Sequence, residues 1–160
     1  MREVVQKEMA KQNLTCNCVR CREVGAGYDA KEKLYLFKEE YEASSSGKET
    51  FLSFENKART KLYGLLRLRL CHAEALAKAG LPLAVIRELH VYGQMAQIGR
   101  PQSSTNAQHS GLGKKLMAEA EKIAKQNKCK NLAVISGVGV RGYYRKLGYK
   151  LHNTYMVKKL

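Results

Sequence analysis

The sequence lacks the features of a membrane-spanning or secreted protein. None of its apolar runs approaches the length of about 20 residues that a helix needs to cross a bilayer. Its start does not follow the charged, apolar and small-residue order of a secretory signal. Residues 1–12 instead have the spacing of a short amphipathic helix. These absences predict a cytoplasmic protein without membrane contact.

Acidic residues are also scarce. The chain carries 14 Asp and Glu against 29 Lys and Arg, which gives a formal net charge of +15. A field of this sign attracts polyanions, and the attraction weakens as the salt concentration rises. We therefore expect a nucleic-acid partner. A solvated basic surface is the alternative, and charge alone does not distinguish RNA from DNA.

No internal repeat is present, and 160 residues suffice for one domain with its own core. Strand patterns come first and are followed by alternating strands and helices, which predicts an α+β fold. A central, mostly antiparallel mixed sheet would then be flanked by helices. The expected strands are 31–43, 50–56, 60–70, 83–93, 131–136 and a hairpin at 149–160, and the expected helices are 112–124 and 140–148. Residues 72–82 fit either a short helix or a loop.

Three of the five cysteines lie within six residues, in the segment CNCVRC. They are Cys16, Cys18 and Cys21. Thiolates at this spacing can converge on one zinc ion, which accepts four cysteine or histidine ligands. Cys71 is the expected fourth ligand and His72 the alternative; three unrelated loop thiols would be the simpler interpretation. We therefore expect a helix and a zinc-binding segment at 1–28, beside a main domain at 29–160. Cys129 is expected to be a packing residue.

The stretch QHSGLGKKL, residues 108–116, places two glycines at the start of an expected helix. Gly111 and Gly113 allow a ligand to approach the backbone closely. The unpaired N–H groups and the positive dipole end of a helix start then favour an anion such as phosphate or pyrophosphate. A dinucleotide site of the Rossmann type would need this turn directly after a strand. A long polar loop intervenes here, which excludes that type of site.

This arrangement resembles the GNAT acetyltransferase fold, in which a Gln/Arg-x-x-Gly-x-Gly/Ala turn holds the pyrophosphate of acetyl-coenzyme A (acetyl-CoA). Gln108, Gly111 and Gly113 match that turn. The motifs CNCVRC, GLLRLRL, RELHVYG and ISGVGVRGYYRKLGY also occur in order. Together they resemble the acetyltransferase half of the Elongator catalytic-subunit family, which carboxymethylates the wobble uridine of tRNA. The resemblance runs from about Cys16 to the C-terminus.

The resemblance implies a binding site for acetyl-CoA. One strand should run beside the pantetheine arm, and the glycine turn should hold the pyrophosphate. Tyr144 should lie near the thioester sulfur, where its hydroxyl can donate a proton to the departing thiolate, while Tyr143 packs in the core. The implied binding residues are Glu88, Leu89, His90, Val91, Gly111, Leu112, Gly113, Lys114 and Tyr144, of which Tyr144 would also be catalytic.

The resemblance also implies a reaction and partners. Acetyl-CoA would supply the two-carbon unit for 5-carboxymethylation of a wobble uridine, so the anticodon region of tRNA is the expected partner. In the family a radical-SAM domain, with an iron–sulfur cluster and S-adenosylmethionine (SAM), completes the reaction. This sequence shows no such domain, and CNCVRC has the wrong spacing for its cluster. The radical-SAM domain of a longer chain and other Elongator subunits are therefore further expected partners.

Two other functions stay open from the sequence. A lysine acetyltransferase that acts on proteins such as histones would need a general base, and Glu88 is the candidate. An ion pair with Arg87 or Arg69 would be the structural alternative for this residue. A zinc-stabilised module that binds nucleic acid without catalysis would explain the charge and the cysteines, but not the glycine turn.

Overall fold

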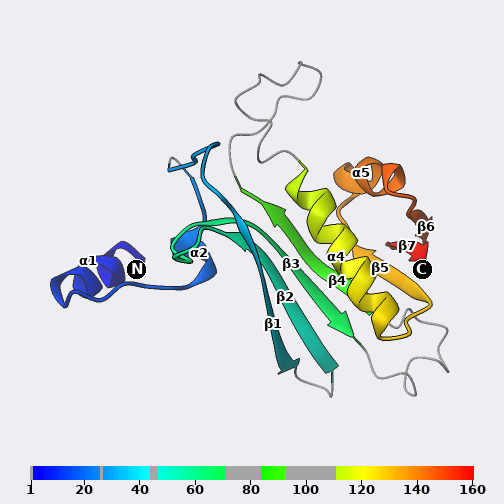
Figure 1. Cartoon of the computed structure of the whole chain (residues 1–160), viewed down its shortest axis with the longest axis horizontal. Helices are drawn as coiled ribbons and strands as arrows, with labels where there is room; N and C mark the ends of the chain where they lie inside the picture. Colours follow the sequence, from blue (N-terminus) through cyan, green and yellow to red (C-terminus); the bar gives the residue numbers. More distant parts are fainter. Residues whose placement is uncertain (1, 26, 44–46, 71–83, 93–110) are drawn as a thin grey trace.

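The computed structural model describes residues 2–25, 27–43, 47–70, 84–92 and 111–160 (Figure 1). Outside these ranges lie Cys71, His72, Gln108 and the stretch expected at 72–82. The two candidates for a fourth zinc ligand and the first residue of the glycine motif therefore stay predictions.

Seven strands form one sheet in the order β1-β2-β3-β4-β5-β7-β6 (Figure 1). Their bounds are β1 Tyr35–Ala43, β2 Gly47–Glu55, β3 Leu62–Leu70, β4 Ala84–Val91, β5 Asn131–Ile135, β6 Lys150–His152 and β7 Tyr155–Lys159. Every neighbouring pair is antiparallel except β4 with β5, which is parallel. The expected mixed, mostly antiparallel sheet is confirmed, and β6 with β7 forms the expected C-terminal hairpin.

One long helix, α4 (Leu112–Gln126), crosses one face of the sheet over β2, β3 and β4 (Figure 1). Its apolar side chains recur every three or four residues, so they form one stripe along the helix. The buried members of this stripe are Leu112, Leu116, Met117, Ala120, Ile123 and Ala124. Most of them pack against Leu66, Leu68, Ile86, Leu132 and Val134 of the sheet. The main core therefore lies between α4 and the sheet.

Two short helices follow β5. They are the 3₁₀ helix η2 (Val138–Val140) and α5 (Arg141–Lys146). Gly148, with φ of +87°, ends α5 in a left-handed turn, and the N–H of Tyr149 donates to the carbonyl of Tyr144 at 3.1 Å. Glycine is the residue that adopts this conformation without strain, so it fixes where the helix stops.

The N-terminal segment holds α1 (Arg2–Lys11) and α2 (Val19–Arg22). Figure 1 shows α1 away from the sheet, whereas α2 lies close to it. Val19 of α2 packs against a small cluster that contains Phe51 and Leu65. None of the helices in the described ranges is both long enough and apolar enough to cross a membrane.

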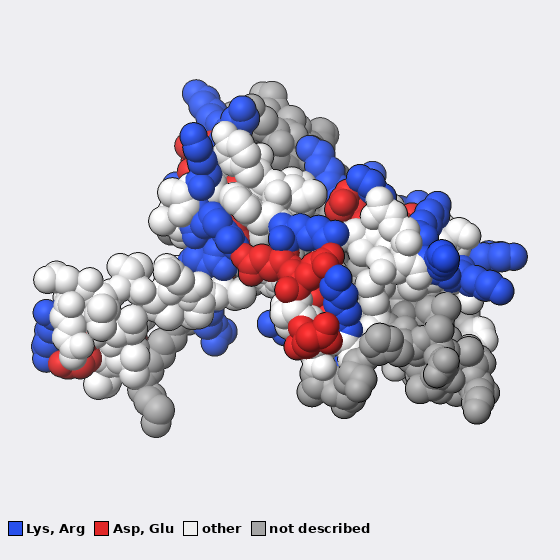
Figure 2. Space-filling view, turned by 60° about the horizontal axis from the view of Figure 1, so that its bottom comes forward, with Lys and Arg blue, Asp and Glu red and all other residues white. Residues whose placement is uncertain are grey.

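Charged side chains are distributed unevenly over the surface (Figure 2). On the face shown, Asp and Glu gather near the middle, and Lys and Arg lie toward both sides. On β1, Glu39 pairs with Arg59, and Glu40 pairs with Lys38 and Lys48. Acidic residues of the N-terminal strands therefore neutralise basic residues nearby.

Candidate active site

β4 and β5 lie side by side at one end and then part. Residues 84–86 pair in parallel with residues 132–134. β5 ends at Ile135, whereas β4 continues to Val91 along β3 alone. Among the described strands nothing pairs with the other edge of β4 beyond residue 86. Its backbone N–H and C=O groups can therefore bind an extended ligand, as an added strand would. We call this gap the β4–β5 opening.

β4 also bulges where the two strands part. The register between β3 and β4 shifts between Arg67 and Leu68, which leaves Arg87 as an extra residue of β4. Bulges recur beside active sites because they redirect side chains and end regular pairing. Here the bulge turns Arg87 toward β2, where it forms an ion pair with the buried carboxylate of Glu49.

Glu88 and His90 follow the bulge and form a small charged cluster. One carboxylate oxygen of Glu88 lies 3.5 Å from Nε of Arg67, and the other lies 3.3 Å from Nε2 of His90. The contact with Arg67 follows from the register, because these two residues lie directly opposite each other on β3 and β4. Arg87, one of the two partners expected from the sequence, pairs with Glu49 instead.

The glycine turn begins α4 beside the end of β4. Gly111 has φ of +81°, a conformation that favours glycine, and no side chain of the described residues caps the first turn. The N–H groups of that turn can therefore bind an anion. A Cβ atom added at Gly113 would lie 2.9 Å from the hydroxyl oxygen of Tyr143 and 3.6 Å from Cγ2 of Val91. The turn, the end of β4 and α5 thus meet at Gly113.

The two adjacent tyrosines of α5 occupy different environments. Their rings pack edge to face with centroids 5.2 Å apart. Tyr144 is 6% exposed and lies in the core beneath α4. Tyr143 is half-buried, and its buried hydroxyl has no hydrogen-bond partner among the described residues. Burial raises the pKa of both side chains, so both hydroxyls stay protonated at neutral pH. The hydroxyl beside the glycine turn belongs to Tyr143.

Two more buried polar atoms near the opening have no partner in the described part of the chain. They are Oγ of Ser136 and Nε of Arg141. Apolar side chains of the same segment are exposed, with Val138 at 76% and Val140 at 51%. A buried polar atom without a partner costs free energy unless a ligand or water satisfies it. The segment after β5 is therefore suited to a ligand that has both amide and apolar parts.

The structure brings most of the predicted binding residues to this opening. His90 and Val91 are exposed on β4, and Lys114 is exposed on the first turn of α4. Leu112 differs, because its side chain is 3% exposed and packs against Val24 and Tyr63, so only its backbone can meet a ligand. Sequence patterns do not single out Ser136 or Arg141 as acetyl-CoA ligands, since which buried polar atom stays unpaired depends on the finished packing.

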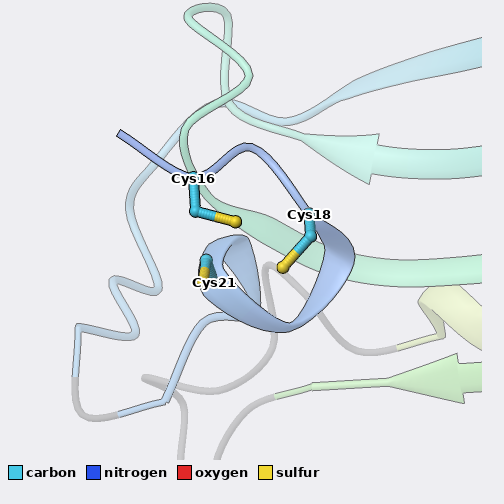
Figure 3. A group of neighbouring side chains, drawn as sticks. All are labelled: Cys16, Cys18 and Cys21. Atoms are coloured by element: carbon cyan, nitrogen blue, oxygen red, sulfur yellow. The ribbon is translucent and has the colours of Figure 1, made fainter. Parts of the chain in front are cut away.

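The three N-terminal cysteines converge on one point (Figure 3). The sulfur atoms of Cys16, Cys18 and Cys21 all lie within 4.8 Å of one another. Three thiolates about 2.3 Å from one zinc ion would lie roughly 3.8 Å apart, so the group needs little movement to bind it. Hydrogen bonding from the Cys16 thiol and from the backbone of Cys21 lowers the pKa of Cys18 to about 7. The donor set therefore fits a zinc site that a fourth ligand would complete.

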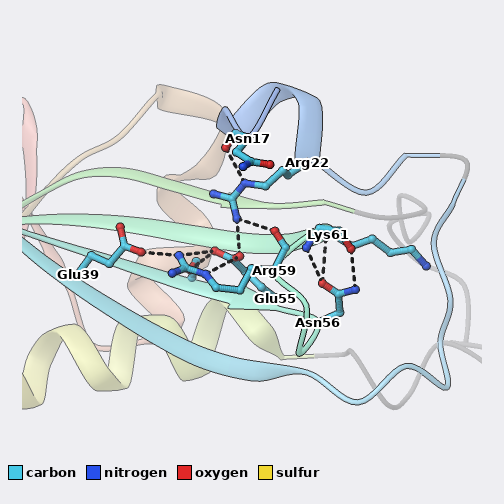
Figure 4. Close-up of polar contacts among 9 residues, drawn as sticks. Asn17, Arg22, Glu39, Glu55, Asn56, Arg59 and Lys61 are labelled. Atoms are coloured by element: carbon cyan, nitrogen blue, oxygen red, sulfur yellow. Dashed lines mark hydrogen bonds and ion pairs between the residues drawn. The ribbon is translucent and has the colours of Figure 1, made fainter. Parts of the chain in front are cut away.

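A buried carboxylate anchors this cysteine segment to the sheet (Figure 4). Glu55, at the end of β2, is fully buried and pairs with Arg22 of α2 and with Arg59. Nε of Arg22 donates to the carbonyl of Asn17 at 2.9 Å, within the cysteine loop. The backbone N–H of Val24 also donates to the carbonyl of the first residue of β3 at 2.9 Å. The three thiols are thus held in place by contacts that do not involve metal.

The Glu55 anchor leads to a stability prediction. We expect Glu55→Gln to lower the free energy of unfolding by about 3 kcal/mol, because Arg22 would lose its buried counter-charge. Glu40→Gln is the matched control, since Glu40 pairs with two lysines at the exposed surface, and we expect a much smaller loss. Urea titrations followed by circular dichroism measure both losses. Equal losses in the two variants would contradict the anchor.

Comparison with known proteins identifies the fold. The profile of the acetyltransferase (GNAT) family matches residues 28–149, which is most of the chain. The chain therefore belongs to the acetyltransferase (GNAT) family, and the expected GNAT fold is confirmed.

Relatives that match nearly the whole chain narrow the identification within this family. The chain is 44% identical over 165 residues to the tRNA uridine(34) acetyltransferase of Methanocaldococcus infernus. This match covers 99% of the chain and 31% of that protein. It is also 43% identical over 166 residues to the human Elongator complex protein 3, and this match covers 100% of the chain and 30% of that protein. The solved structure of the M. infernus Elp3, lacking its residues 1–46, has a TM-score of 0.76 and 40% identity over 99% of the chain and 38% of that structure.

The chain thus spans about a third of the length of the curated relatives that it matches. The resemblance to the acetyltransferase portion of the Elongator catalytic-subunit family, expected from the motifs, is confirmed at this level of identity.

Proposed function

We propose that the chain is the acetyl-CoA-binding domain of a tRNA-modifying enzyme and supplies the acetyl unit for 5-carboxymethylation of a wobble uridine. The observation that carries the proposal is the β4–β5 opening, with the glycine turn, the free edge of β4 and a tyrosine hydroxyl at its mouth. The names of the relatives, which specify uridine 34 of tRNA, supply the substrate class.

Each part of the opening has a task in this proposal. The backbone of the free edge of β4, residues 88–91, donates hydrogen bonds to the two amides of the pantetheine arm and accepts hydrogen bonds from them. The N–H groups from Gly111 to Lys114 bind the pyrophosphate, and the bare Cα of Gly113 keeps the approach open. When the acetyl group leaves, the C–S bond breaks and the thiolate takes a proton from a tyrosine hydroxyl. We keep Tyr144 as the proposed donor. The hydroxyl of Tyr143 lies beside Gly113, where the pyrophosphate binds, and the pantetheine arm separates that end of the ligand from the thioester sulfur.

The remaining partners are proposed on the same basis. The acetyl acceptor lies in the anticodon region of tRNA, and a radical-SAM domain with its iron–sulfur cluster and SAM activates the acetyl unit. We propose that this domain comes from a longer protein, since the chain matches 31% of the length of the M. infernus relative. Zinc held by Cys16, Cys18 and Cys21, with Cys71 as the fourth ligand, would order the N-terminal segment. The proposed location is the cytoplasm.

One assay separates the three candidate functions. The domain is incubated with acetyl-CoA and either tRNA or a lysine-containing histone peptide, and free CoA is measured with a thiol reagent. Without a radical-SAM domain the acetyl group passes to water, so we expect release of CoA and acetate when tRNA is present and none above background with the peptide. Release with the peptide alone would favour a protein lysine acetyltransferase. No binding of acetyl-CoA, together with binding of tRNA, would favour a non-catalytic nucleic-acid module.

The lysine acetyltransferase has one candidate base in the structure. Glu88 is half-buried beside the opening, but its two oxygens already contact Arg67 and His90. These contacts occupy the carboxylate oxygens that a substrate amine or a bridging water would have to reach. We therefore place this function second.

The tyrosine assignment gives a kinetic prediction. We expect Tyr144→Phe to slow the release of CoA by about 100-fold with unchanged affinity for acetyl-CoA, because only the proton donor is lost. Tyr143→Phe is the matched control, and we expect its rate of release to change by less than about threefold, since its hydroxyl lies at the pyrophosphate end of the opening. Single-turnover CoA release at saturating acetyl-CoA measures both. The reverse order of the two effects would give the donor role to Tyr143.

A further inference from the structure

The last 39 residues of the chain include no acidic residue. Ten of the 29 Lys and Arg, and none of the 14 Asp and Glu, lie between Lys122 and Leu160. The rest of the chain mixes both signs. Net charge is therefore concentrated in α5, β6, β7 and the end of α4, rather than spread over the molecule.

Most of these basic side chains are exposed and have no ion-pair partner among the described residues. Lys122 and Lys158 are the exceptions, because they pair with Glu119 and Glu121 on α4. The others that are fully exposed are Lys125, Lys128, Lys130, Arg145, Lys146, Lys150 and Lys159. We call these seven residues the basic edge.

Several members of the basic edge are neighbours in space. The backbone N–H of Lys128 donates to the carbonyl of Lys125 at 2.9 Å, at the end of α4. The N–H of Leu160 donates to the carbonyl of Lys130 at 2.9 Å, which brings the chain end beside the start of β5. Lys150 lies on β6, the outermost strand of the sheet. Figure 2 shows Lys and Arg projecting from this side of the molecule, at the right of the view.

Charge on the N-terminal strands is arranged differently. There the cations are matched by nearby carboxylates, as in the pairs Arg87 with Glu49 and Arg59 with Glu39. A cation that already has a carboxylate partner gains less from a phosphate. The basic edge is therefore the part of the described surface that is best suited to a polyanion.

We propose that the basic edge binds the phosphate backbone of double-stranded RNA. The inference rests on the proposed function, because it assigns a surface to the tRNA partner. Proteins that bind single strands stack bases on exposed aromatic rings, whereas duplex RNA is held through its phosphates and sugars. Tyr149, between Lys146 and Lys150, is 1% exposed, and the exposed ring of Tyr155 lies at the opposite end of β7 from Lys159. Phosphate contact, not base stacking, is what this edge offers.

The edge extends away from the β4–β5 opening. Lys125 lies at the opposite end of α4 from the glycine turn, and a helix of 15 residues is about 22 Å long. A duplex bound along the edge would therefore leave the acetyl-CoA site open while its end approaches α5. Loss of charge on the edge should weaken RNA binding without changing the affinity for acetyl-CoA.

A pair of charge-reversal variants tests the proposal. The edge variant carries Lys128→Glu, Lys130→Glu and Lys159→Glu. The control variant carries Lys7→Glu, Lys33→Glu and Lys57→Glu, three exposed lysines outside the edge, so the net charge is the same in both. Affinity for an unmodified tRNA transcript is measured from 50 to 200 mM salt. A hairpin RNA and an unstructured RNA of equal length serve as competitors, and acetyl-CoA affinity is measured separately.

We expect the edge variant to bind tRNA at least about tenfold more weakly at low salt, with a flatter dependence on salt, because phosphate contacts are lost. The control should change by less than about threefold, and the hairpin should compete better than the unstructured strand. Equal weakening in both variants would overturn the edge as the binding surface. If the two RNAs competed equally well, the proposed preference for double-stranded RNA would be wrong. If the wild-type chain did not bind acetyl-CoA, the result would instead count against the proposed function.

Discussion

Gly113→Val should weaken the binding of acetyl-CoA by on the order of 100-fold, about 2.7 kcal/mol. A Cβ atom at this position would lie 2.9 Å from the hydroxyl of Tyr143, so the tyrosine must move into the opening or the turn must shift. Either change blocks the close approach of the pyrophosphate to the N–H groups of α4. Equilibrium dialysis with radiolabelled acetyl-CoA measures the loss.

Gly25→Val is the matched control for this substitution. A Cβ atom at Gly25 would meet nothing within 4 Å, and its φ lies outside the left-handed region. We expect this variant to bind acetyl-CoA as the wild type does. Circular dichroism establishes that both variants are folded. A folded Gly113→Val chain with wild-type affinity would remove the glycine turn from the site.

Cys18→Ser should reduce bound zinc from about one ion per chain to nearly none after dialysis. Cys18 has a lowered pKa of about 7, so its thiolate forms near neutral pH, and serine offers no comparable ligand. Metal and protons compete for the same sulfur atoms, and affinity should therefore fall as the pH drops below 7. Elemental analysis of the dialysed protein measures the metal.

Cys129→Ser is the control, because Cys129 is buried far along the sequence and its sulfur contacts the carbonyl of Asn127 at 3.8 Å. It should leave the zinc content unchanged. Acetyl-CoA affinity should be unchanged in both variants, since the cysteine segment lies on other elements than the β4–β5 opening. Wild-type protein without stoichiometric zinc would overturn the metal site. If the Cys71→Ala variant retained zinc, only the role of Cys71 as the fourth ligand would be excluded.

The architecture could be predicted from the sequence because its patterns are strong. The spacing of Leu112, Leu116 and Ala120 is that of a helix with one buried face, and the structure has α4 there. The alternating segments 50–56 and 60–70 became β2 and β3, whose register then fixed the partners of their charged residues. Local periodicity determined these elements, and tertiary packing did not override it.

The side-chain roles in the opening were harder to predict. Tyr143 and Tyr144 are adjacent and chemically identical, so only the angle at which α5 packs on the core decides which hydroxyl reaches Gly113. The partner of Glu88 was likewise set by a bulge at Arg87, and no sequence pattern announces where a strand gains an extra residue. The converging cysteines were predictable, because their spacing alone brings three thiols to one loop.

Calorimetric titration of the wild-type domain with acetyl-CoA tests the central claim most directly. We expect one site per chain with a dissociation constant in the micromolar range, and competition by CoA, because the opening binds the pantetheine arm and the pyrophosphate that both molecules share. Absence of a binding isotherm for folded protein at concentrations up to the millimolar range would contradict the assignment of the β4–β5 opening as an acetyl-CoA site.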